Sequence, residues 1–69
     1  MPANMKGMIA DAFVSLSGEK PIDKITVKDL VEKCSISRQT FYYHFQDILE
    51  VIEWSAEQVF QQLLARSLE

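Results

Sequence analysis

Arginine, glutamine, tyrosine and histidine side chains gather in one short segment, at Arg38, Gln39, Tyr42, Tyr43 and His44. At about 100° per residue, the first four fall within roughly 140° of arc on one face of a helix. Arginine and glutamine form paired hydrogen bonds with the edges of guanine and adenine, and tyrosine hydroxyls suit phosphate oxygens. The residue types and their spacing therefore favour a surface that binds nucleic acid.

The same segment is expected to form a helix that holds these side chains in position. Ser37 is its natural N-cap, and Phe41 and Phe45 lie one turn apart on the face predicted to enter the core. Arg38 and Gln39 then occupy the first turn, which is the part of a recognition helix that reaches base edges. The free backbone N–H groups of that turn also favour a nearby phosphate.

A second helix is expected directly before it, at residues 27–34. Thr26 is its predicted N-cap, and Asp29, three residues on, completes a capping box. Only Ser35 and Ile36 separate this helix from the N-cap of the next one, so the two helices are expected to cross steeply. The local pattern is that of a helix–turn–helix.

A first amphipathic helix is predicted at residues 4–17, and Gly18 ends it. Its apolar stripe consists of Met5, Ile9, Ala12, Phe13 and Leu16. In the loop that follows, Ile22 and Ile25 are expected to anchor the chain to the core.

A longer fourth helix is predicted from its N-cap Asp47 to about Arg66, with Glu50 completing a second capping box. One apolar stripe of this helix is predicted at Leu49, Ile52, Ala56, Phe60 and Leu63. Further apolar residues widen the arc: Ile48, Val51, Trp54, Val59, Leu64 and Leu68. Three short neighbours cannot cover so much apolar surface, so the C-terminal half is expected to contact a region outside this chain. Trp54 is expected at the edge of that contact, with core packing as the alternative.

The composition is that of one small folded domain, with 69 residues, of which 48% are hydrophobic and 25% charged. The net charge of −3 is distributed unevenly. Residues 20–44 carry five Lys or Arg against three acids, and residues 45–69 carry one against five. The acidic total therefore does not exclude a local surface that attracts phosphate.

Several other classes of protein are disfavoured by the composition. No apolar run approaches the roughly 18 residues of a membrane span, and the N-terminus lacks the pattern of a secretory signal. The single cysteine, Cys34, is expected to be a small buried residue in a protein of the reducing cytoplasm. Paired carboxylates, clustered metal ligands and an activated nucleophile are missing, so no enzyme, metal or cofactor is expected.

The residues from Lys24 to Leu49 resemble the N-terminal DNA-binding region of TetR/AcrR-type transcriptional regulators. The resemblance rests on Thr26-Val-Lys-Asp-Leu and on Ile36-Ser-Arg-Gln-Thr-Phe-Tyr-Tyr-His-Phe, and it covers roughly residues 5–55. Within the family, the chain is similar to the subgroup near the dihydroxyacetone-kinase regulators. The resemblance implies an all-α fold, with a three-helix, homeodomain-like helix–turn–helix bundle in residues 1–47. It also implies a longer fourth helix in residues 48–69, which connects to a ligand-binding and dimerisation domain outside this chain.

The resemblance also assigns the interface. Arg38 and Gln39 match positions that contact bases in the major groove, and Thr40 matches one that contacts base or backbone. The positions that contact phosphate or the DNA backbone are matched by Tyr42, Tyr43, His44, Thr26, Val27 and Lys28, and Ser37 completes the predicted set. The implied partner is a palindromic operator in double-stranded DNA, bound by a homodimer of the full-length protein. A small-molecule effector would bind to the C-terminal domain.

Two positions depart from the family pattern. The family often has a lysine just inside helix four, as a phosphate contact, where this chain has Ile48. The turn between helices two and three usually contains glycine, where this chain has Ser35. A left-handed Ser35 would carry strain of about 1 kcal/mol.

Plainer interpretations stay open for several of these residues. Tyr42 and Tyr43 could be half-buried aromatic residues with solvated hydroxyls, His44 a structural histidine, and Lys28 part of a solvated face. The alternative function is a helical protein-interaction or dimerisation module that uses helix four and does not bind DNA.

Overall fold

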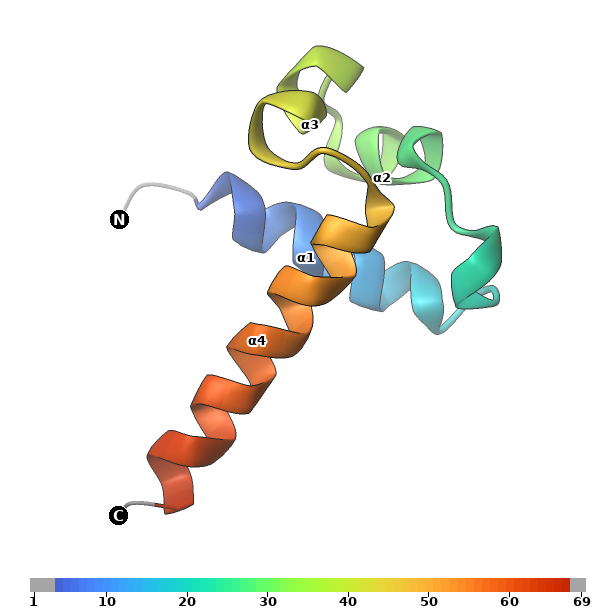
Figure 1. The fold of residues 1–69 in the computed structure, drawn as a ribbon. Coiled ribbons are helices and arrows are strands. Elements are labelled where there is room, and N and C mark those ends of the chain that lie inside the picture. Colours follow the sequence, from blue (N-terminus) through green and yellow to red (C-terminus); the bar gives the residue numbers. More distant parts are fainter. Residues whose placement is uncertain (1–3, 68–69) are drawn as a thin grey trace.

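The computed structural model describes residues 4–67, where helices follow one another with short connections and no strand forms. The elements are α1 (Met5–Ser17), the short 3-10 helix η1 (Ile22–Lys24), α2 (Val27–Cys34), α3 (Arg38–His44) and α4 (Ile48–Ser67). In Figure 1, α3 lies above α1, and α4 crosses α1 and extends away from the other helices. The predicted all-α fold, with a helix–turn–helix and a longer fourth helix, is confirmed. Leu68, part of the predicted apolar arc, lies outside the described residues.

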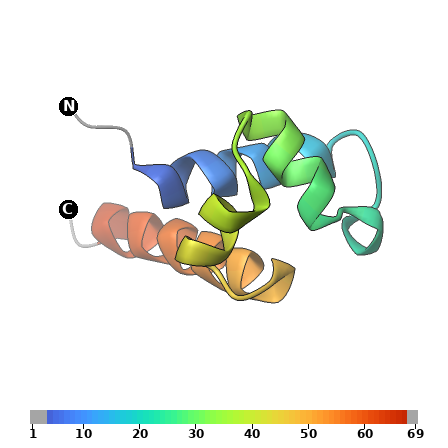
Figure 2. The same cartoon turned by 90° about the horizontal axis from the view of Figure 1, so that it is seen from above.

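Helix α1 supplies one wall of the core. Asn4 caps it by accepting a hydrogen bond from the N–H of Gly7 at 3.2 Å. The predicted apolar stripe is confirmed at Ile9, Ala12, Phe13 and Leu16, all of which are buried. Figure 2, in which the molecule is seen from above, shows that α3 lies over the N-terminal half of α1.

The centre of the core is aromatic. Phe41 and Phe45 are buried as predicted, although α3 ends at His44 and Phe45 already has an extended backbone. The two ring centroids are 5.9 Å apart. Leu30 of α2 and Val51 of α4 join the same cluster. Since burial of one phenylalanine side chain stabilises the folded state by about 1.5–3 kcal/mol, this pair holds α3 firmly on the bundle.

The connection between α1 and α2 differs from the prediction at one of its two anchors. Ile25 is buried in the core, but Ile22 is 53% exposed. Ile22 is the first residue of η1, a single tight turn that follows Pro21 at the rim of the molecule. The extended backbone after that turn carries Ile25 inward. One apolar residue therefore anchors this connection.

Helix α4 begins as predicted at Asp47, whose carboxylate accepts a hydrogen bond from the N–H of Glu50 at 2.9 Å. The Glu50 carboxylate accepts from the N–H of Gln46 at 3.4 Å, where a capping box would engage the N–H of Asp47. The second half of the predicted capping box is therefore shifted by one residue.

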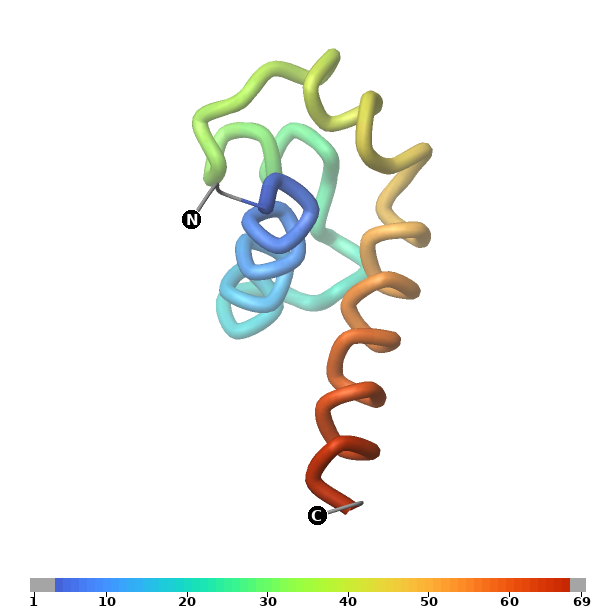
Figure 3. The backbone as a smooth tube through the Cα atoms, turned by 90° about the vertical axis from the view of Figure 1, so that its left-hand side faces the viewer, coloured from blue at the N-terminus to red at the C-terminus, as the bar shows by residue number. Residues whose placement is uncertain are grey.

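The other helices cover only part of the predicted apolar arc of α4. Val51 is buried, with Ile48 and Ile52 partly buried beside it. Four members of the predicted stripe are exposed: Leu49, Ala56, Phe60 and Leu63. The reason is geometric, because α1 meets only the N-terminal half of α4 and selects the face that it covers. Figure 3 shows α4 continuing beyond the other helices.

Two single residues complete the comparison with the prediction. Trp54 is partly buried and packs edge-on against Phe45, with centroids 6.3 Å apart, so the core alternative is correct for its ring. Cys34 is half-buried rather than buried, and its thiol donates to the carbonyl oxygen of Met8 at 3.7 Å. Desolvation raises the pKa of this thiol. None of the helices within residues 4–67 combines the length and apolar character that crossing a membrane requires.

Candidate nucleic-acid interface

The turn between α2 and α3 fixes the relative position of the two helices. Ser35 adopts the left-handed conformation, with φ 56° and ψ 43°. Its N–H donates to the carbonyl of Glu32 at 3.3 Å, and the N–H of Ile36 donates to the carbonyl of Val31 at 3.0 Å. This pair of hydrogen bonds defines a Schellman motif, in which the left-handed position favours glycine. The strain predicted for a left-handed Ser35 therefore applies.

The hydroxyl groups of two predicted interface residues, Ser37 and Thr26, act as helix caps. Ser37 Oγ accepts a hydrogen bond from the N–H of Thr40 at 3.1 Å and lies 3.1 Å from Thr40 Oγ1. Thr26 Oγ1 accepts from the N–H of Asp29 at 3.1 Å, and the Asp29 carboxylate accepts from the N–H of Thr26 at 3.0 Å. The predicted capping box of α2 is thus confirmed. These hydroxyls hold the two helices in position.

The outward face of α3 presents four polar or aromatic side chains to solvent. Arg38 and Gln39 are exposed in its first turn. Tyr42 is 54% exposed and Tyr43 85% exposed, while Phe41 between them and the first turn is fully buried. The Tyr42 ring packs edge-on against Phe41, with centroids 5.1 Å apart and planes at 89°. The predicted arc of α3 therefore lies on one accessible face, fixed from beneath by an aromatic contact.

His44 lies at the border between this face and the core. It is partly buried, and its ring packs edge-on against Tyr43, with centroids 5.2 Å apart and planes at 88°. The contact orients both rings at the end of α3. The structure thus gives His44 a packing role and leaves part of its surface accessible.

The three residues predicted to contact DNA at the start of α2 differ in their exposure. Val27 is partly buried and packs against the core cluster. Lys28 is exposed. Thr26, which caps the helix, is exposed as well.

Two of the five cationic side chains in residues 20–44 form ion pairs with carboxylates. Lys20 Nζ lies 2.9 Å from the Asp29 carboxylate, and Lys33 Nζ lies 3.6 Å from that of Glu19. The hydrogen bond from Lys20, followed by that from the N–H of Thr26, lowers the pKa of Asp29. Within residues 4–67, Arg38 and Lys28 form no such pair. Positive charge without a carboxylate partner therefore remains at the starts of α2 and α3.

One further cation lies beside α3 although the predicted interface does not include it. The ammonium group of Lys6 stands 5.4 Å from the centroid of the Phe45 ring. No local pattern could reveal this contact, because it joins α1 to the residue that follows α3. A lysine in the first turn of an amphipathic helix is a weak signal by itself.

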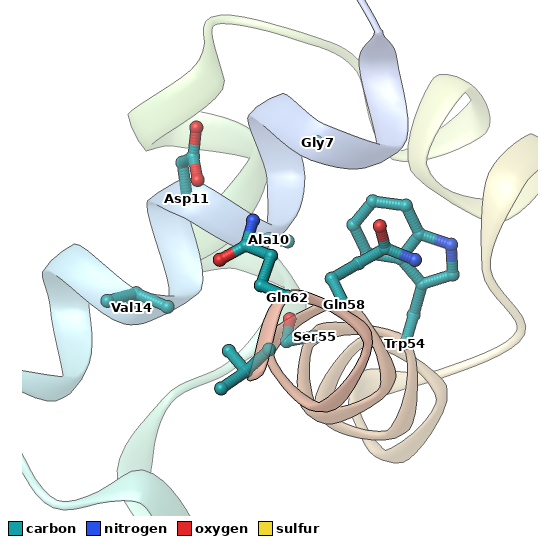
Figure 4. A pocket seen from close by; sticks show the side chains of 9 residues that line it. Gly7, Ala10, Asp11, Val14, Trp54, Ser55, Gln58 and Gln62 are labelled. Carbon is teal, nitrogen blue, oxygen red and sulfur yellow. The ribbon is translucent and has the colours of Figure 1, made fainter. Parts of the chain in front are cut away.

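A cleft of about 320 Å³ lies between α1 and α4, away from these residues. Figure 4 shows Trp54, Gln58 and Gln62 on its α4 side, with Ala10 and Val14 on its α1 side. None of the predicted interface residues lines it. Among residues 4–67, no three His, Cys, Asp or Glu side chains lie close enough to hold a metal ion.

The fold and the Schellman turn define a helix–turn–helix protein. Residues 9–53 match the family of bacterial regulatory proteins described as the tetR family. Since this match spans more than half of the chain, the chain belongs to the TetR family of bacterial regulators. The resemblance drawn from the sequence is confirmed.

Two bacterial relatives show how the chain compares with longer members. The HTH-type dhaKLM operon transcriptional activator DhaS of Lactococcus lactis is 37% identical over 57 residues, which are 83% of this chain and 30% of that protein. The uncharacterized HTH-type transcriptional regulator YxbF of Bacillus subtilis is 30% identical over 53 residues, which are 77% of this chain and 14% of that protein. The matched residues thus cover less than a third of the length of either relative. No solved structure matches the chain.

Proposed function

We propose that this chain binds double-stranded DNA with a sequence preference, with α3 lying in the major groove, and thereby regulates transcription. The observation that carries the proposal is the exposed arc of Arg38, Gln39, Tyr42 and Tyr43 above a fully buried Phe41. Membership of the TetR family supports it. Because the target is the chromosome, we assign this function to the cytoplasm.

The exposed side chains divide into those that read bases and those that contact the backbone. Arg38 and Gln39, in the first turn, form paired hydrogen bonds with base edges. Tyr42, Tyr43 and Lys28 contact phosphate oxygens, which positions the protein without reading sequence. His44 and Thr40, both partly buried, contribute at the margin of this surface. Thr26, Val27 and Ser37 hold the helix starts that approach the DNA backbone.

We further propose that two copies bind together. Helix α3 has seven residues and is about 10 Å long, so it spans only a few base pairs. Two copies related by a two-fold axis would read a palindromic operator with greater affinity and specificity. The longer protein would supply the dimer contact and the site for a small-molecule effector, since the chain covers 30% and 14% of its two relatives.

Selection of bound sequences from a pool of random duplexes tests this proposal directly. The chain is fused to a short coiled coil that enforces a parallel dimer, and bound DNA is sequenced. A two-fold-symmetric consensus is expected. Gln39→Ala should relax the preference at one position in each half-site, whereas the matched control Gln61→Ala, on exposed α4, should not. Absence of duplex binding at low salt by the fused dimer would contradict the proposal.

A second candidate is an interaction module that dimerises through α4 without binding DNA. It is favoured by the exposure of Val59, Phe60, Leu63 and Leu64, each 47–61% exposed. Sedimentation of the unfused chain tests it, combined with titration by duplex DNA. A stable dimer that Leu63→Lys dissociates, together with no DNA affinity, would favour this candidate over DNA binding.

A further inference from the structure

Lys6 reaches from α1 to the end of the candidate recognition helix. Its ammonium group stands 5.4 Å from the centroid of Phe45, the residue that directly follows α3. Phe45 is itself 2% exposed, so the ring that faces the ammonium is fixed in the core. Helices α1 and α3 are in contact, which makes the position of Lys6 a property of the bundle and not of a free side chain.

The position of Lys6 is unfavourable for α1 itself. Lys6 lies in the first turn of α1, where no acidic residue is present. The positive end of the helix dipole favours acids in a first turn and disfavours cations. The face of the Phe45 ring attracts the ammonium and offsets this repulsion. The helix dipole therefore gives no reason for a cation at this position, and the contact with Phe45 is what holds it there.

The residues that directly follow α3 in the sequence carry no cationic side chain. Residues 45–50 contain Asp47 and Glu50 and no lysine or arginine. Both carboxylates accept backbone hydrogen bonds at the start of α4. Lys6 differs from Lys20 and Lys33 in that it forms no ion pair within residues 4–67. It is thus a cation that the fold brings to this end of α3 from a distant part of the sequence.

We propose that Lys6 contacts a DNA phosphate, as a positioning residue that α1 contributes to the interface. The inference rests on the DNA-binding function proposed above. Figures 1 and 2 show that the N-terminal end of α1 and the start of α2 lie on opposite sides of α3. Lys6 and Lys28 therefore bind the DNA backbone on the two sides of the helix, and Phe45 holds the Lys6 ammonium ready for this contact.

The salt dependence of DNA binding tests this role. The full chain is titrated onto a fluorescein-labelled duplex of arbitrary sequence at several low KCl concentrations, since a phosphate contact requires no operator. Each phosphate contact contributes about 0.9 to the slope of log K against log salt. Lys6→Gln should lower the slope by about 0.9 and weaken binding by about tenfold near 50 mM salt. Lys6→Arg should keep the wild-type slope.

Two further variants separate this role from an effect on folding. Lys33→Gln removes a cation paired with Glu19 and should leave the slope unchanged. Lys6→Met keeps an aliphatic side chain over Phe45, so it should fold even if Lys6→Gln does not, and it should show the same reduced slope. A wild-type slope in Lys6→Met, or a reduced slope in Lys6→Arg, would overturn the inference. If the wild-type chain binds duplex DNA neither alone nor as the coiled-coil dimer, the proposed function fails and the role of Lys6 fails with it.

Discussion

The outward face of α3 and the C-terminal half of α4 are both exposed, but their chemistry differs. The face of α3 carries a guanidinium, an amide and two phenols. The C-terminal half of α4 carries Val59, Phe60, Leu63 and Leu64, which are 56%, 61%, 55% and 47% exposed. Polar groups such as those on α3 suit a polar partner such as DNA. An exposed apolar face such as that of α4 is instead typical of a surface that another apolar surface covers.

The two faces also differ in how they are supported. Helix α3 has seven residues, which is too short for a helix to be stable by itself, so caps and tertiary contacts must hold it. Helix α4 has twenty residues and continues by its own hydrogen bonds beyond its last neighbour. Exposure on α3 is thus imposed by the core beneath it, whereas exposure on α4 follows from the length of the helix. Both regions contain phenylalanine and arginine, which provides matched variants.

The largest difference is expected between two Phe→Ala substitutions. Phe41→Ala removes a fully buried ring beneath the α3 face and should lower the free energy of unfolding by about 3–5 kcal/mol. The free energy of unfolding of the whole domain is expected to be about 4–10 kcal/mol, so most of it would be lost and DNA binding should be lost with the fold. Phe60→Ala removes an exposed ring and should change the free energy of unfolding by less than about 0.5 kcal/mol. Urea denaturation followed by circular dichroism measures both.

A large loss in the free energy of unfolding for Phe60→Ala in dilute solution would contradict this comparison. That result would mean that the C-terminal half of α4 is already covered by a second copy. Repeating the denaturation over a range of protein concentrations distinguishes the two cases, because only an associating chain shows a concentration-dependent midpoint.

The two exposed arginines should differ in DNA binding more than in stability. Arg38→Ala should reduce discrimination at the base pair that Arg38 contacts by about 1–3 kcal/mol, because a paired hydrogen bond to guanine is lost. Arg66→Ala, in the last turn of α4, should leave the selected consensus unchanged. Competition between duplexes that differ at single base pairs measures the effect. Equal losses in the two variants would indicate that the arginines act only through net charge.

A substitution in the turn between α2 and α3 is expected to raise the free energy of unfolding, by a smaller amount than Phe41→Ala lowers it. Ser35→Gly should stabilise the chain by about 0.5–1 kcal/mol, because relief of left-handed strain exceeds the added entropy of the unfolded chain. Ser15→Gly, at an exposed position inside α1, should destabilise it by a similar amount. Thermal unfolding of both variants measures the difference. A destabilised Ser35→Gly would show that the serine side chain makes a favourable contact in the turn.

Features that depend on local sequence were predictable, and those that depend on helix packing were not. The caps at Thr26, Ser37 and Asp47 follow from a residue type at a fixed spacing. Which part of the wide apolar arc of α4 is buried could not be predicted, because α1 selects it and α1 is distant in the sequence. The contact between Lys6 and Phe45 was missed for the same reason. The roles of the interface residues toward DNA stay predictions.

The smallest effect on the free energy of unfolding is expected from the ion pair between Lys20 and Asp29, in the first turn of α2. The hydrogen bond from Lys20 lowers the pKa of Asp29, and the N–H of Thr26 adds to this. A carboxylate whose pKa is lower in the folded state contributes stability above its ordinary pKa, and that contribution is lost as the pH falls through the folded-state value.

The free energy of unfolding of the wild-type chain should therefore fall between about pH 5 and about pH 3 more steeply than that of Asp29→Asn. Lys20→Met should flatten the same curve, since it removes the main cause of the shift, while Lys33→Met should not. Urea denaturation at each pH gives the curves. Parallel curves for the wild type and Asp29→Asn would mean that the ion pair between Lys20 and Asp29 contributes nothing to the position of α2. The helix caps and the Schellman turn would then be enough to hold α2 in place.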